Sequence, residues 1–80
     1  MSVIPFRSYR PDPRNGWVYA SESYETAYVD DIETETFAGF IVVHMADGGD
    51  SAAIFRGYRT LADAQTAAKL IAYKQNAVLT

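Results

Sequence analysis

The sequence predicts an α+β fold, in which a three- or four-stranded antiparallel sheet carries one C-terminal helix behind an irregular N-terminal arm. Two runs of apolar, β-branched and aromatic residues, 37–46 and 52–58, flank a four-residue turn, Asp47-Gly48-Gly49-Asp50. This pattern is a strong hairpin signal. A helix-start pattern and an alanine-rich helical segment follow the second run. A sheet hairpin therefore leads directly into a helix.

Residues 1–16 form the predicted arm. All three prolines lie in it, and the turn dipeptide Asn15-Gly16 ends it. Because proline lacks a backbone donor, this density excludes a helix and disfavours a central strand. Phe6 and Tyr9 give the arm two rings to bury against the sheet. Residues 17–80 form a single α+β domain, since 80 residues leave no room for a second one.

Residues 23–36 allow two interpretations. Tyr24, Tyr28 and Ile32 recur every four residues, as on one face of a helix. Tyr24, Thr26 and Tyr28 also alternate, and tyrosine and threonine favour strands. Whether this segment is strand or helix stays open from the pattern alone, and we favour a strand.

The favoured interpretation has strands over 17–22 and 24–29, an acidic turn at Asp30-Asp31, and a long strand after it. Gly39 predicts a bend or bulge in that long strand. Its run 37–46 is apolar on both faces, with Phe37, Ile41, Val43 and Met45 on one and Phe40, Val42 and His44 on the other. Two-sided apolarity is typical of a central strand covered on both sides.

The clearest helix follows Thr60, which can cap it with Asp63 three residues later. At 100° per residue, one face collects Leu61, Ala64, Ala67, Ala68, Ile71 and Ala72. Leu70, Tyr73 and Ala77 fall on the opposite side. One helix covers only one face of a sheet, so the arm or another molecule is expected on the second face. We therefore predict a homodimer with Leu70 and Tyr73 in its interface.

Charge is distributed unevenly along the chain, whose net charge is −3. Between Asn15 and Phe55 there are eight acids and no Lys or Arg, giving −8, while seven bases against two acids give +5 in the remainder. The predicted partner-binding residues are Glu22, Tyr24, Glu25, Tyr28, Asp30, Asp31, Glu33 and Glu35. Tyrosine is favoured in interface cores, and charge complementarity steers encounter with a basic surface. The competing interpretation is a solvated face that only keeps the protein in solution.

No motif in the sequence carries chemistry, so we predict no catalytic residues, no metal, no cofactor and no enzyme. Cysteine is absent and His44 is the single histidine, whereas zinc needs four ligands. The Asp47–Asp50 segment lacks the twelve-residue calcium pattern and joins two strands. Apolar runs are shorter than a membrane span or a signal-peptide core. A cytoplasmic location is the expectation.

In size, lack of cysteine, acidic middle and single strand–helix core, the chain looks like the small anti-defence proteins of bacterial viruses, anti-CRISPR proteins among them. Those proteins share no common motif, so the resemblance assigns no functional residue. It implies a phage-encoded, non-enzymatic inhibitor that occludes a basic surface of a host CRISPR surveillance complex or nuclease. Its location would be the host cytoplasm.

Two alternative functions stay open. The first is a small nucleic-acid-binding protein that uses Arg7, Arg10, Arg14, Arg56 and Arg59. Residues 57–64 are similar to the strand-to-helix passage of sheet-reading DNA-binding domains. Phosphate binding draws on Lys and Arg, however, and the strands between positions 17 and 55 offer none, which disfavours direct binding of nucleic acid. The second alternative is a small enzyme or ligand carrier, which requires a concave pocket.

Overall fold

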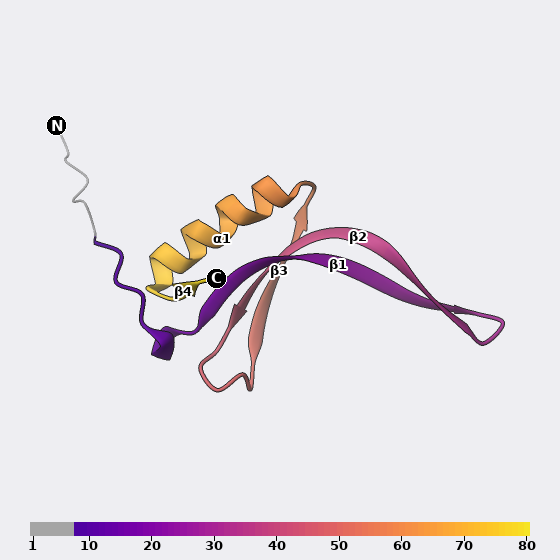
Figure 1. Cartoon of the computed structure of the whole chain (residues 1–80), viewed down its shortest axis with the longest axis horizontal. Helices are drawn as coiled ribbons and strands as arrows, with labels where there is room; N and C mark the ends of the chain where they lie inside the picture. The colour runs from indigo at the N-terminus through magenta and orange to yellow at the C-terminus, as the bar shows by residue number, and fades with distance from the viewer. Residues whose placement is uncertain (1–7) are drawn as a thin grey trace.

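The computed structural model describes residues 8–80, and in them a four-stranded curled sheet carries one helix on one face (Figure 1). The elements are η1 (Pro13–Asn15), β1 (Trp17–Val29), β2 (Ile32–Met45), β3 (Ala52–Tyr58), α1 (Leu61–Gln75) and β4 (Val78–Leu79). The strand order is β3-β2-β1-β4. The predicted α+β fold is confirmed. The antiparallel arrangement holds for β1, β2 and β3, whereas the two-residue β4 lies parallel to β1 and makes the sheet mixed.

Strands β1 and β2 form one long hairpin, which the sequence had divided into three strands. The predicted strands 17–22 and 24–29 are a single strand, and the helical alternative for 23–36 is wrong. Alternate residues of the segment lie on the same face of the strand pair, so the two-residue alternation matches the structure and the four-residue spacing does not. The two-residue turn lies at Asp30-Asp31, where both residues have positive φ (52° and 66°), as a type I′ hairpin turn requires.

A bulge in β2 changes which residues face the helix. Ser23 pairs with Gly39 and Tyr24 pairs with Phe37, which leaves Ala38 as an extra residue on β2. Gly39 has φ 104° there, so the bend expected at this glycine is present. The extra residue turns the Phe37 ring towards Phe40, with centroids 5.2 Å apart. Phe37 therefore does not share a face with Ile41, Val43 and Met45, as the simple alternation had predicted.

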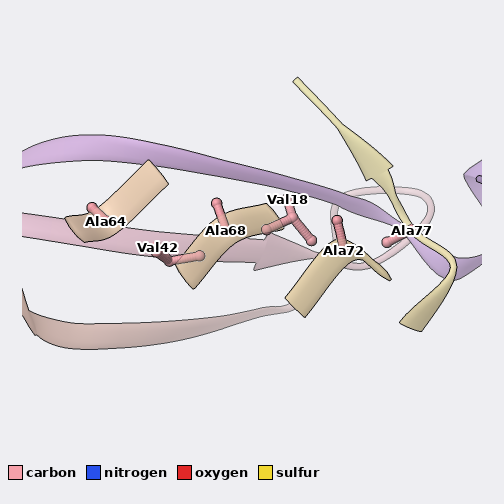
Figure 2. Close-up of a cluster of buried hydrophobic side chains, with 6 residues drawn as sticks. All are labelled: Val18, Val42, Ala64, Ala68, Ala72 and Ala77. Atoms are coloured by element: carbon pink, nitrogen blue, oxygen red, sulfur yellow. The ribbon is translucent and has the colours of Figure 1, made fainter. Parts of the chain in front are cut away.

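The core is small and lies between α1 and the inner part of the hairpin. Figure 2 shows its six fully buried residues, Val18, Val42, Ala64, Ala68, Ala72 and Ala77. Because the fully buried residues of the helix are all alanines, the helix lies close against the two valines of β1 and β2. Leu61, predicted on the same face, is 44% exposed at the start of the helix. A domain of this size with so few large buried side chains has little stability to spare.

Both ends of α1 are capped by side chains or backbone that the sequence supplies. The Thr60 hydroxyl accepts a hydrogen bond from the Asp63 N–H (3.0 Å), as the capping pattern predicted. At the other end Asn76 adopts the left-handed conformation and terminates the helix. Ala77 is consequently beyond the helix and fully buried, whereas the sequence placed it on the outer side. The reversal also brings Val78–Leu79 beside β1.

The described part of the N-terminal arm, residues 8–16, packs against the carboxyl end of α1 (Figure 1). The Tyr9 ring stacks on Tyr73, and its hydroxyl donates to the Ala77 carbonyl. The His44 Nε2 lies 2.8 Å from the Asn15 carbonyl oxygen and ties the arm to β2. Tyr9, which is 37% exposed, thus packs against the helix and not against the second sheet face. Phe6, the other predicted anchor, lies outside the described residues.

Candidate protein-binding site

The outer parts of β1 and β2 extend beyond the rest of the molecule as a two-stranded ribbon, residues 24–37, which we call the outer ribbon (Figure 1). β4 pairs only with Trp17 and Val18, and β3 pairs with β2 only over residues 40–45. Among the described residues, each strand of the outer ribbon therefore has the other as its one neighbour. At about 3.3 Å per residue, the six residues 24–29 carry the ribbon about 20 Å away from the body.

The acidic residues predicted to bind a partner all lie on this ribbon or at its root, and all are exposed: Glu22, Glu25, Asp30, Asp31, Glu33 and Glu35. Within residues 8–80 the single salt bridge joins Arg14 to Asp12 at 2.8 Å. None of the six carboxylates is therefore neutralised by a basic group of the described chain. Their charges face solvent together on one projecting element.

The register of the ribbon sorts these residues into two faces, because directly opposite residues of an antiparallel pair lie on the same face. One face holds the pairs Tyr24–Phe37, Thr26–Glu35 and Tyr28–Glu33, and we call it the aromatic face. The other holds Glu25–Thr36, Ala27–Thr34 and Val29–Ile32. The structure thus brings most of the predicted site together, places the two aspartates at the tip, and separates Glu25 from the rest.

The aromatic face carries a row of rings that the sequence did not identify in full. Tyr24 contacts Phe37 edge-on with centroids 5.8 Å apart, and Phe37 contacts Phe40 in the same way. Tyr24 and Phe37 are each 51% exposed, and Tyr28 is 71% exposed. Phe37 and Phe40 were assigned to opposite faces from the sequence. The glycine that marks the bulge was the signal that could have brought them together.

One hydrogen bond fixes the root of this row. The Tyr24 hydroxyl donates to the Glu22 Oε2 at 2.5 Å. That hydrogen bond raises the pKa of Tyr24, and desolvation and the nearby charges of Glu22 and Glu35 raise it further. Tyr24 is therefore held neutral beside two carboxylates, with its ring set against Phe37.

The tip of the ribbon combines backbone strain with exposed apolar side chains. Asp30 and Asp31 both occupy the left-handed region, which Asn-Gly adopts at lower cost in a type I′ turn. They also place two like charges side by side. Val29 and Ile32, which flank the turn, are 60% and 65% exposed. The tip thus combines a turn that stability alone would not favour with uncovered apolar groups.

The predicted dimer residues lie on the outer side of α1. Leu70 is 61% exposed, whereas Tyr73 is 38% exposed and stacks on Tyr9 with ring centroids 6.0 Å apart. The arm thus covers part of the surface that was predicted for a second copy, and leaves Leu70 uncovered.

The arginines proposed for nucleic-acid binding are not gathered on one surface element. Arg14 is held by Asp12, and this ion pair raises the pKa of the guanidinium and lowers the pKa of the carboxyl. Arg10, Arg56 and Arg59 are exposed on the arm, on β3 and ahead of α1. Arg7 lies outside the described residues. No basic groove comparable to the acidic ribbon results in the described part of the chain.

Two shallow hollows are candidate pockets for a ligand. One, of about 270 Å³, lies between α1 and β1 and is lined by Ala20, Gln65, Ala68, Lys69, Leu79 and Thr80. The other, of about 250 Å³, includes His44, whose Nε2 is engaged by the Asn15 carbonyl. Residues 8–80 contain no cluster of His, Asp and Glu able to hold a metal ion. Ser51 and Asp47 also line the second hollow, but among the described residues no hydrogen bond joins either side chain to the His44 ring.

The ribbon is therefore the feature that sets this molecule apart from an ordinary small sheet-and-helix domain. Among the described residues, no helix is long and apolar enough to cross a membrane. Comparisons with protein-family models, with curated proteins and with solved structures found no match to the chain.

Proposed function

We propose that this protein is a non-enzymatic protein-binding module that inserts its outer ribbon into a basic, partly apolar surface of a partner. The observation that carries the proposal is the aromatic face, on which exposed rings alternate with carboxylates that make no salt bridge within residues 8–80. Rings supply buried area on docking, and the carboxylates steer the encounter and set its orientation.

The energetics of the ribbon support a docking role. A two-stranded hairpin without cover is at best marginally stable in water. Tyr28, Val29 and Ile32 are each at least 60% exposed, so the ribbon leaves apolar surface uncovered at its far end. Burial of such side chains is worth about 1.5–3 kcal/mol for each one fully covered. When a partner covers the ribbon, this burial free energy stabilises the complex, because these side chains stay exposed in the isolated molecule.

More specifically, we propose that the protein inhibits a nucleic-acid-binding protein. Surfaces that bind phosphate backbones are rich in Lys and Arg, which are the groups that the ribbon complements. A ribbon seated on such a surface would exclude the nucleic acid by charge and by volume. A phage-encoded anti-CRISPR protein, acting in the host cytoplasm on a surveillance complex or nuclease, fits this description and is the example we propose.

The proposal is tested by two double variants that remove equal charge from different places. Glu33→Gln with Glu35→Gln neutralises the aromatic face, and Asp47→Asn with Asp50→Asn neutralises the β2–β3 turn. Each changes the net charge from −3 to −1. Proteins captured from a host lysate by the wild-type chain are identified and then titrated against both variants at 50 and 300 mM salt.

We expect the ribbon variant to bind its partner about three- to tenfold more weakly at low salt and to lose much of the salt dependence. The turn variant should bind like the wild-type chain. Equal affinities and equal salt slopes for all three proteins would overturn the proposal.

A further inference from the structure

We infer that the outer face of α1 is a docking site for the outer ribbon of a second copy of this chain. The inference rests on the proposed function, because it takes the ribbon to be a docking element. The inference goes beyond the proposed function by naming one surface that the ribbon fits, and this surface belongs to a second copy of the same protein.

The outer face of α1 combines apolar and basic groups. The buried positions Ala64, Ala68 and Ala72 define the side that faces the sheet, and Leu70 lies on the side turned away from it at 61% exposure. At 100° per residue, Lys69 and Lys74 fall on either side of Leu70, and the exposed Asp63, two turns earlier, falls between Leu70 and Lys74. The two lysines outnumber this one acid, and an exposed leucine beside them is the counterpart of exposed rings between glutamates.

Charge complementarity indicates a second copy as the occupant. Lys69 and Lys74 are exposed and take part in no salt bridge within residues 8–80, as is also true of Glu33 and Glu35. The ribbon cannot reach the helix of its own chain, because it projects away from α1 (Figure 1). Two copies related by a two-fold axis can satisfy both sets of charges, since each ribbon then lies on the other copy's helix.

The dimensions of the two elements agree. The 15 residues of α1 span about 22 Å at 1.5 Å per residue, and the ribbon extends about 20 Å beyond the body at 3.3 Å per residue. One ribbon is therefore long enough to follow the helix up to the point near its carboxyl end where Tyr9 of the arm covers Tyr73. A protein with a core of two valines and four alanines also gains from association, which is a common source of stability in small domains.

A consequence is that self-association and partner binding compete for the same ribbon. In the dimer the aromatic face is covered by α1 of the other copy. Dilution or a partner of higher affinity releases it. The dimer is then a reserve form, and only the monomer presents the ribbon.

Complementary charge reversal tests the inference by sedimentation equilibrium between 5 and 500 μM, with folding of each protein checked by circular dichroism. One variant carries Lys69→Glu and Lys74→Glu, and the other carries Glu33→Lys and Glu35→Lys. We expect the wild-type chain to dimerise, with an affinity that falls about tenfold or more between 50 and 500 mM salt. Each variant alone should be monomeric, and their equimolar mixture should form heterodimers. The milder pair Lys69→Gln and Lys74→Gln replaces the first variant if reversal prevents folding, and it should weaken the dimer.

A wild-type chain that is monomeric at 500 μM overturns the inference, as does a dimer that persists in both variants or a mixture that stays monomeric. These outcomes leave the proposed function standing if capture of the partner still depends on Glu33 and Glu35. The Lys69→Glu, Lys74→Glu variant separates the two ideas further, because it should lose self-association and keep partner binding. Loss of capture in that variant would assign the helix face to the partner and not to a second copy.

Discussion

The inner and outer parts of the β1–β2 hairpin are built from similar residues and have opposite environments. In the inner part Val18 and Val42 are fully buried beneath α1, whereas in the outer part Val29 and Ile32 are 60% and 65% exposed. Both strands run through from one part to the other, with a bulge at Ala38, and the cover over them changes (Figure 1). Residues that favour β-strands therefore determine that a segment pairs with another strand. The neighbouring elements determine whether its apolar side chains stabilise the fold or remain available for binding.

Replacing a valine by aspartate in the inner part and in the outer part should give the largest difference in the free energy of unfolding between the two parts. Val42→Asp places a carboxylate where no partner exists, at a cost of about 3 kcal/mol or more. That cost approaches the whole stability of about 3–5 kcal/mol expected for so small a core. Val29→Asp at the exposed tip should change the free energy of unfolding by less than about 0.5 kcal/mol. Thermal unfolding followed by circular dichroism measures both, and a similar loss in the two variants would contradict the comparison.

Substitution of Gly16, at which the arm joins β1, should lower stability nearly as much as Val42→Asp. Gly16 has φ 91°, and a Cβ there would lie 2.1 Å from the Met45 carbonyl oxygen. Gly16→Ala should therefore lower the free energy of unfolding by about 2–3 kcal/mol. Gly48→Ala is the control, because its φ is 87° but its nearest heavy atom would be 3.7 Å away. It should cost about 1 kcal/mol. Equal losses in denaturant titrations would mean that the close approach at Gly16 does not matter.

The amino-terminal cap of α1 makes a smaller contribution to the stability of the body. Thr60→Ala removes the acceptor of the Asp63 N–H and should lower the free energy of unfolding by about 1 kcal/mol. Thr66→Ala, within the helix, should be neutral or slightly stabilising, since alanine is the better helix former. Urea titrations of the two variants compare them directly. If Thr66→Ala were the more damaging change, the capping role of Thr60 would be refuted.

The Asp12–Arg14 ion pair of the arm should make a modest contribution to the response of stability to acid. The hydrogen bonds and charge of Arg14 lower the pKa of Asp12 below its usual 3.8. A lowered pKa in the folded state stabilises the fold above pH 3.8, and this contribution disappears as the pH falls through the folded value. The melting temperature of the wild-type chain should thus fall more between pH 5 and pH 2.5 than that of Asp12→Asn. Parallel profiles would show that the ion pair contributes nothing.

Much of the fold could be predicted because local signals agreed with it. The Asp47–Asp50 turn, the Thr60 cap and the two-sided apolar run of β2 each specify their element through nearby residues. β4 could not be predicted, because two residues carry no periodicity and depend on the reversal at Asn76. The turn at Asp30-Asp31 was predicted. Its projection beyond the rest of the molecule was not, because that depends on where β3 and α1 end.

The candidate site was predicted in part for the same reason. Counting charges located the acidic segment, and alternation placed Tyr24 and Tyr28 on one face. The contribution of Phe37 depended on the extra residue at Ala38, since one bulge reverses every side chain beyond it. Glu25 was grouped with the others by sequence proximity, although a strand places neighbouring residues on opposite faces.

Removal of the ribbon tests most directly the claim that the body folds without it and that the ribbon serves binding. Ser23 and Gly39 are paired neighbours, so an Asn-Gly turn can join residue 23 to residue 39 in place of residues 24–38. Thermal unfolding of this shortened chain should remain cooperative, with the helical signal of α1 retained. A shortened chain that is unfolded would contradict the account, because the ribbon would then belong to the fold itself.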